Sequence, residues 1–240
     1  MKPVNGDQLL EESFGLLTKV LEEAHALRKT DDLREAFVYR HARNISQLGQ
    51  AILCLETHDQ PDSCPIIVRS MLEGLFKLVA ATKVTNAAVE IVLHEVKTEI
   101  KKIEDWIKIL GGDDDSTLKE TILELKSFAK SLEAKHGVQS VKNWNVLECA
   151  KISNLGEFYR QDYFLFSKHT HATASGIIAQ EHETVRDRVL RIVIFIVLCS
   201  VGHLVQVAET KTPQQHIDEA ARLMEVAISF MKEKQSSQAS

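Results

Sequence analysis

The sparse use of proline constrains this chain more than any other feature of its sequence. There are four prolines, and none of them lies between Pro65 and Pro213. Glycine is also infrequent, with 10 residues in a chain of 240. Folds with many strands need frequent turn residues, so this scarcity predicts long helices rather than sheets.

Apolar residues recur at helical spacing between the few turn signals, which predicts an all-α, single-domain bundle of about eight or nine helices. Two of the expected helix starts carry capping patterns, because Asp32 with Glu35 and Asn154 with Glu157 have the N-cap and N3 spacing. The expected helices span residues 7–29, 31–58, 64–83, 85–110, 117–135, 143–152, 155–168, 181–209 and 213–234.

The segment from Ile192 to Ala208 contains no charged residue. Its β-branched residues would suit a buried strand, but no second strand is evident to pair with it. A membrane span needs about 20 mostly apolar residues, and His203 and Gln206 interrupt the second half of this segment. We therefore expect a central apolar helix near 189–208 inside the bundle, and no contact with a membrane.

The chain is expected to form one bundle in three parts. Residues 1–32 form an N-terminal helix that packs on the bundle, 33–210 form the main helical domain, and 211–240 form a C-terminal helix with a frayed tail. The four cysteines include no C-x-x-C pair, and the first residues lack the apolar core of a signal peptide. We therefore expect a cytoplasmic protein with reduced thiols.

Charge and motif content argue against several classes of function. Lys and Arg number 29 against 34 Asp and Glu, and this net charge of −5 disfavours non-specific nucleic-acid binding through a broad basic surface. The sequence contains no G-x-G-x-x-G, G-x-x-x-x-G-K-[ST], G-x-S-x-G or H-E-x-x-H motif. His169 and His171 would diverge by about 200° on a helix, so they do not predict a zinc site. We expect neither a metal nor a cofactor.

One pattern resembles a ribonuclease motif. The higher eukaryotes and prokaryotes nucleotide-binding (HEPN) domains, which are small helical ribonucleases and toxins, carry an arginine, four to six residues and then a histidine. Arg34 and His41 have this spacing, with six residues between them. A chain with this many arginines and histidines is expected to match about once by chance, and the intervening EAFVYR lacks the polar residues usual in that motif. We therefore interpret both as helix-surface residues.

Two other segments carry the candidate site. In the first, Arg69 and Glu73 lie four residues apart on an otherwise apolar helix, where burying either charge alone would cost several kcal/mol. In the second, Tyr159, Tyr163 and Ser167 follow one another at i+4 on one helix face. We expect the two segments to contribute to one hydrogen-bonded cluster.

A histidine follows the tyrosine-rich helix where small residues suggest that the helix ends. His171 has the better spacing, and His169 is its rival. These segments resemble a family of mostly prokaryotic helical proteins, domain of unknown function 5677. The resemblance lies in R-S-x-x-E, which starts here at Arg69, followed by an apolar stretch and later by tyrosines leading into S-x-x-x-H, which starts at Ser167. Trp144, upstream of the tyrosines, also fits.

The resemblance covers roughly residues 33–208 and implies an all-helical fold with no established activity. A distant relation to the HEPN ribonucleases would place their motif at Arg160 and His169. These residues are separated by eight positions, outside the spacing of that motif. The departure puts a ribonuclease assignment in doubt.

Two interpretations of the cluster stay open. As an active site, it would cleave RNA or act on a nucleotide without a metal, in prokaryotic defence or stress response. His171 would be the general acid or base, Arg69 would stabilise phosphorane charge, and Glu73 would orient one of them. The residues that would bind the RNA or nucleotide ligand are Tyr159, Tyr163, Ser167 and His169.

The alternative is that the cluster is structural. It would then satisfy buried polar groups and hold the helices in register, which is the commoner fate of such residues. On this interpretation the chain is a non-enzymatic helical module that binds a protein partner or forms a homodimer. A cluster that lines an open cleft would favour the active site, and a sealed cluster would favour the structural role.

Overall fold

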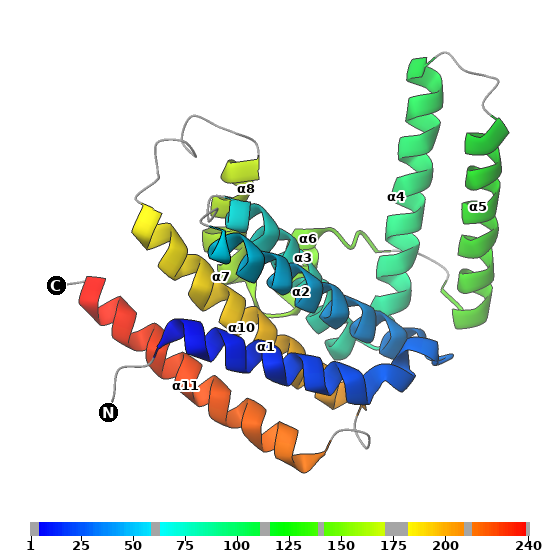
Figure 1. Cartoon of the computed structure of the whole chain (residues 1–240). Helices are drawn as coiled ribbons and strands as arrows, with labels where there is room; N and C mark the ends of the chain where they lie inside the picture. Colours follow the sequence, from blue (N-terminus) through cyan, green and yellow to red (C-terminus); the bar gives the residue numbers. More distant parts are fainter. Residues whose placement is uncertain are drawn as a thin grey trace.

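The computed structural model describes residues 5–58, 63–110, 116–138, 142–170, 182–208 and 213–238, and it describes side chains there except at 110, 168–170, 182–185 and 231–238. These residues form helices and no strand (Figure 1), which confirms the predicted all-α bundle. The elements are α1 (Gly6–Glu23), η1 (Ala24–Lys29), α2 (Leu33–Thr57), α3 (Cys64–Lys83), α4 (Ala87–Leu110), α5 (Ser116–His136), α6 (Val146–Ile152), α7 (Gly156–Phe158), η3 (Tyr159–Tyr163), α8 (Phe164–Thr170), α10 (His182–Ala208) and α11 (Gln214–Gln238).

Capping side chains begin several of these helices. Asn5 precedes α1, and its Oδ1 accepts the Asp7 backbone N–H at 3.0 Å. Asp32 is the N-cap of α2, as predicted, and its Oδ1 accepts from the backbone N–H groups of Arg34 and Glu35 at 2.8 and 3.3 Å. Each cap satisfies backbone donors that have no partner within the first helical turn.

The predicted cap at Asn154 is wrong. The N-cap position of α7 is Leu155, and Asn154 instead has a positive φ of 62°. Asparagine enters this left-handed region more readily than most residues because its short side chain can form local hydrogen bonds. Asn154 therefore makes the turn after α6, where the Leu155 N–H donates to the Ala150 carbonyl at 2.9 Å.

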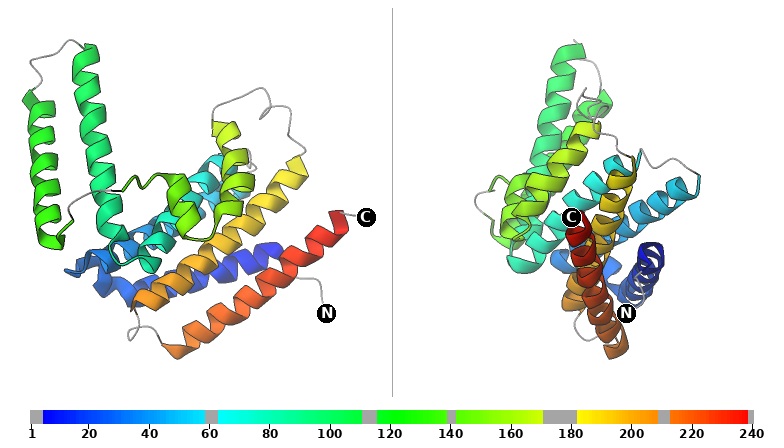
Figure 2. Two further views of the ribbon diagram at one scale, coloured as in Figure 1. Left: turned by 180° about the vertical axis from the view of Figure 1, so that it is seen from behind. Right: turned by 90° about the vertical axis from the view of Figure 1, so that its left-hand side faces the viewer.

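The apolar helix α10 lies at the centre of the bundle, as predicted, and packs against α1, α2, α3 and α11 (Figure 2). Its buried side chains include Val193, Val197, Val201 and Leu204. Within the described part of the chain, one helical segment, Arg186–Ala208, is long and apolar enough to cross a membrane. Core helices also meet that criterion, and this segment contributes to the core here.

Helices α4 and α5 form a hairpin that projects from the rest of the bundle (Figures 1 and 2). The start of α4 is anchored in the main core through Ala87, Ala88 and Ile91, and two small separate apolar clusters hold the two helices of the hairpin together. The inner one contains Val89, Leu93, Ala129 and Leu132, and the outer one contains Ile100, Ile103 and Ile122. The hairpin therefore leaves much of its surface without a partner among the described residues.

Candidate functional site

A triad of polar side chains connects α3 to the turn η3. The Tyr163 hydroxyl accepts a hydrogen bond from Nη2 of Arg69 at 3.0 Å and donates one to Oε1 of Glu73 at 2.6 Å. The same Arg69 and Glu73 atoms lie 3.3 Å apart, as an i,i+4 ion pair on α3. The two predicted segments therefore meet through three residues, which we call the Arg69–Glu73–Tyr163 triad.

A π-helical turn positions the tyrosine of this triad. In η3 the backbone N–H of Phe164 donates to the Tyr159 carbonyl, five residues back. The rings of Tyr159 and Tyr163 stack with centroids 5.0 Å apart, and Phe76 of α3 lies beside both rings. The guanidinium carbon of Arg69 also lies 5.1 Å from the Tyr163 ring centroid. Aromatic packing thus aims the Tyr163 hydroxyl at α3.

Burial raises the pKa of one member of the triad, the Tyr163 phenol. Tyr163 is buried, while the side chains of Arg69 and Glu73 are 27% and 29% exposed. Burial, reinforced by the hydrogen bond to Glu73, raises the pKa of Tyr163 to about 12. Near neutral pH the phenol therefore stays protonated and bridges the two charged groups.

The remaining predicted site residues do not join the triad in the described structure. The Ser167 hydroxyl donates to the Tyr163 carbonyl at 2.7 Å, within its own helical segment. Tyr159 contributes its ring by stacking. The His169 side chain and all of His171 lie outside the described residues. The predicted catalytic role of His171 therefore stays a prediction.

A second ion pair, between a half-exposed arginine and a buried aspartate, lies next to the triad and was not predicted. The Arg188 guanidinium on α10 donates to the Asp162 carboxylate at 2.7 Å, and Asp162 is buried. Burial raises the pKa of Asp162, although Arg188 and Arg191 act in the opposite direction. No local spacing connects two residues 26 positions apart, so no sequence signal identified this pair.

Arg34 and His41, which match the HEPN spacing, make separate contacts. Arg34 donates through Nε and Nη2 to the carbonyls of Ala81 and Thr82, at 3.1 and 2.7 Å, and so caps the end of α3. The His41 ring packs on Phe37, with centroids 4.3 Å apart. Burial, aided by the charge of Lys77, lowers the pKa of His41 to about 4. Both residues therefore have structural contacts, but the prediction that they are helix-surface residues is wrong, because both are half-buried, Arg34 against the end of α3 and the His41 ring against Phe37.

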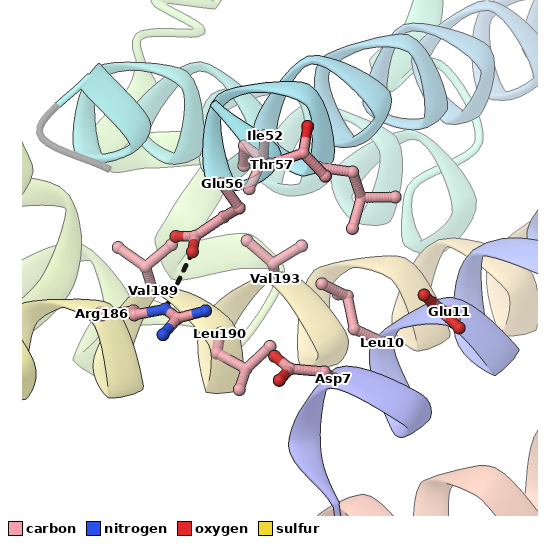
Figure 3. A pocket seen from close by; sticks show the side chains of 11 residues that line it. Asp7, Leu10, Glu11, Ile52, Glu56, Thr57, Arg186, Val189, Leu190 and Val193 are labelled. Atoms are coloured by element: carbon pink, nitrogen blue, oxygen red, sulfur yellow. Dashed lines mark hydrogen bonds and ion pairs between the residues drawn. The ribbon is translucent and has the colours of Figure 1, made fainter. Parts of the chain in front are cut away.

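A cavity of about 300 Å³ lies between α1, α2 and α10 (Figure 3). Its rim carries Asp7 and Glu11 together with an ion pair between Arg186 Nε and Glu56 Oε2, 2.8 Å apart. Its apolar lining is formed by Leu10, Ile52, Leu53, Val189, Leu190 and Val193. Three helices that are distant in sequence build this cavity, so sequence patterns did not indicate it.

Metal ligands do not gather in the described ranges. Among those residues, no group of three or more His, Cys, Asp or Glu side chains is placed to hold a metal ion.

Comparison with known families assigns the chain. The model of a family of unknown function, DUF5677, matches residues 35–185. This chain is a member of the DUF5677 family. The predicted resemblance is thereby confirmed, and the match spans the triad and the hairpin of this DUF5677 protein. No curated protein and no solved structure matches the chain.

Proposed function

We propose that this DUF5677 protein is a non-enzymatic helical module that forms a homodimer through its α4–α5 hairpin. The observation that carries the proposal is an exposed aromatic pair on the projecting hairpin. Trp106 on α4 is 62% exposed and Phe128 on α5 is 48% exposed. Large exposed aromatic residues are typical of surfaces that another protein covers.

The two helices of the hairpin are in a definite antiparallel register. Lys97 on α4 pairs with Glu133 on α5 at 2.7 Å, and Glu104 pairs with Lys126 at 2.9 Å. The paired residue on α4 changes from Lys97 to Glu104, seven positions later, and its partner on α5 changes from Glu133 to Lys126, seven positions earlier. In this register Trp106 lies within about one helical turn of the level of Phe128.

Helical periodicity places the aromatic residues and these ion pairs on opposite faces of the hairpin. We call the buried residues of the two small clusters, with the half-buried Val96, Ile107 and Leu125 packed against them, the apolar seam. The four ion-paired residues each directly follow a seam residue, as Glu104 follows Ile103. Trp106 and Phe128 each directly precede a seam residue, which is Ile107 or Ala129. A step of one residue turns a helix by about 100°, so the two sets face opposite sides. We call the side with Trp106 and Phe128 the aromatic face.

The charge of the hairpin permits a second copy to cover the aromatic face. Helix α4 contains four lysines and five acidic residues, and α5 contains four lysines and three acidic residues. The eight positive and eight negative charges of the two helices cancel, and Asp113, Asp114 and Asp115, which lie between the helices in sequence, add three negative charges. The helices α4 and α5 of two copies can therefore meet face to face without net repulsion between them and form a four-helix arrangement with two-fold symmetry.

The state of the triad is consistent with a module that lacks an active site. Arg69 and Glu73 bind the same tyrosine hydroxyl and each other. Burial holds that hydroxyl protonated, which makes it a weak proton donor near neutral pH. These contacts connect α3 to η3 and support a structural role for the triad.

Sedimentation velocity on the full chain tests the proposal, from about 1 to about 100 μM. We expect a dimer for the wild type and a monomer for Trp106→Ala/Phe128→Ala, because the double variant removes the apolar anchors of the interface. The control is Leu123→Ala, since Leu123 is 69% exposed and directly follows the seam residue Ile122, which places it on the opposite face. This variant should dimerise like the wild type. A monomeric wild type throughout the range, or a double variant that still dimerises, would contradict the proposal.

A further inference from the structure

A second surface, separate from the hairpin and the triad, carries an unusual concentration of positive charge. A pocket of about 570 Å³ lies between η1 and α2. Four cationic side chains line it, and no carboxylate does. These cations are Arg28, Lys29, Arg40 and Arg43, and we call this site the basic pocket.

Local structure explains why these residues converge. Arg28 and Lys29 occupy the last turn of the 3₁₀ helix η1, where positive charge is favourable near the helix carboxyl end. Arg40, Arg43 and Gln47 follow at spacings of three and four residues along α2, so they share one face of that helix. The short connection through residues 30–32 folds the end of η1 back beside this face.

The arginines of the basic pocket differ from every other arginine in the chain. The sequence contains ten arginines. Seven of them bind a carboxylate, carbonyl or hydroxyl oxygen, namely Arg34, Arg69, Arg160, Arg186, Arg188, Arg191 and Arg222. Arg28, Arg40 and Arg43 have no hydrogen-bond or ion-pair partner among the described residues. Three guanidinium groups that have no partner in the described part of the chain therefore line one pocket.

No acidic residue that is close to the pocket in sequence lines it. Asp32 turns its Oδ1 towards the backbone N–H groups at the start of α2. Glu22 lines an adjoining cavity of about 270 Å³ that shares Tyr39 and Arg43 with the basic pocket. The adjoining cavity adds His25, whose Nδ1 lies 3.4 Å from the Tyr39 hydroxyl. The four cationic side chains of the basic pocket repel one another, and an anion that binds between them relieves this repulsion.

We infer that the basic pocket binds an oligophosphate, meaning two or three consecutive phosphate groups such as those of a nucleoside triphosphate. Guanidinium groups form paired, charge-assisted hydrogen bonds with phosphate oxygens. Four cations spread over two elements match the charge of a triphosphate better than that of a single phosphate. The amides of Asn44 and Gln47 complete the lining with further donors.

The distribution of charge favours an oligophosphate over a long nucleic acid. Extended nucleic acids need a basic stripe that neutralises many phosphates in succession. The whole chain carries −5, and its other arginines are already paired. The concentrated positive charge of this pocket therefore suits a compact polyanion.

Isothermal titration calorimetry with sodium tripolyphosphate tests the inference on the full chain. We compare the wild type with Arg40→Ala/Arg43→Ala, in which both changed residues are exposed on the surface of α2. The charge-matched control is Arg160→Ala/Arg222→Ala, which removes two exposed arginines outside the pocket. Thermal melts establish that both variants are folded. Inorganic phosphate, ATP and a short single-stranded oligonucleotide are titrated as comparison ligands.

The wild type should bind tripolyphosphate saturably and at least about tenfold more tightly than inorganic phosphate. The affinity of the pocket variant for tripolyphosphate should be about 100-fold lower, because each of its two missing arginines contributes about tenfold. The affinity of the control should fall by less than about threefold. ATP that binds with the same affinity as tripolyphosphate supports the inference. ATP that binds more tightly supports it as well, because the additional affinity comes from contacts with the nucleoside. Absence of saturable binding, or equal losses in both variants, would overturn it. If the oligonucleotide binds more tightly than tripolyphosphate and the pocket variant weakens that binding, the site is a nucleic-acid surface, and the oligophosphate inference is wrong.

Discussion

A single hydroxyl group connects two parts of the chain that are 94 residues apart. Tyr163 accepts from Arg69 and donates to Glu73, so its hydroxyl uses both of its hydrogen-bonding roles. The ion pair alone would leave two half-buried charges with one contact of 3.3 Å between them. The tyrosine thus supplies the hydrogen bonds that make burial of these charges tolerable.

Replacing Tyr163 by phenylalanine should lower the free energy of unfolding by about 2 kcal/mol, because two hydrogen bonds to charged groups are lost without removing the ring. Urea denaturation measures this change. Tyr159→Phe is the matched control, since Tyr159 stacks on the same ring and no hydrogen bond of its hydroxyl is seen in the described residues. Equal effects of the two substitutions would show that the hydroxyl of Tyr163 is not the stabilising group.

At the scale of elements, one glycine sets how closely α1 approaches α2. A Cβ atom added at Gly49 would lie 1.9 Å from Cζ of Phe14, whose ring is buried between the two helices. Such a separation is far below a van der Waals contact. Gly49 is therefore required by the close approach of an aromatic ring, and not by the conformation of its own backbone.

We expect Gly49→Ala to lower the free energy of unfolding by about 2 kcal/mol, because the Phe14 ring must move out of a well-packed site. Gly15→Ala is the control, because beyond the neighbouring backbone of its own helix nothing lies within 4 Å of its added Cβ, and alanine favours the helix by up to about 1 kcal/mol. Urea denaturation measures the free energy of unfolding of both variants. Combining Gly49→Ala with Phe14→Leu should recover part of the loss, and a Gly49→Ala variant as stable as Gly15→Ala would contradict this account.

On the scale of the whole molecule, the core is unevenly distributed. The main apolar cluster joins α1, α2, α3, α10 and α11 and takes in the start of α4 through Ala87, Ala88 and Ile91, whereas the rest of the hairpin relies on two small clusters. Small clusters bury little apolar surface, and local stability follows the amount of surface buried. The hairpin should therefore open more readily than the rest of the bundle.

Hydrogen exchange followed by mass spectrometry should show this difference. Amides of α5 should exchange through an opening that costs less free energy than the opening of α10. If the hairpin is the homodimer interface, protection of α5 should also rise with protein concentration, while protection of α10 should not. Identical opening free energies for α5 and α10 at every concentration would show instead that the molecule opens as one unit.

Much of the fold could be predicted because the responsible interactions are local. Helical periodicity and the cap at Asp32 depend on residues a few positions apart, and the α2 and α3 boundaries agree with the predicted ones to within two residues. The uncharged run from Ile192 indicated the central helix for the same reason, since an element that is apolar all round has to be surrounded. At Asn154 the local pattern was misleading, because a turn and a cap favour the same residue type.

The candidate sites depended on tertiary structure to a greater degree. The sequence by itself determined the helices, the i,i+4 pairing of Arg69 with Glu73 and the family to which the chain belongs. Only the tertiary structure decided that Tyr163 joins that pair and that η1 and α2 concentrate positive charge in one pocket. The physical reason is that helix formation depends on neighbours along the chain, whereas these contacts depend on how helices pack and turn against one another in space.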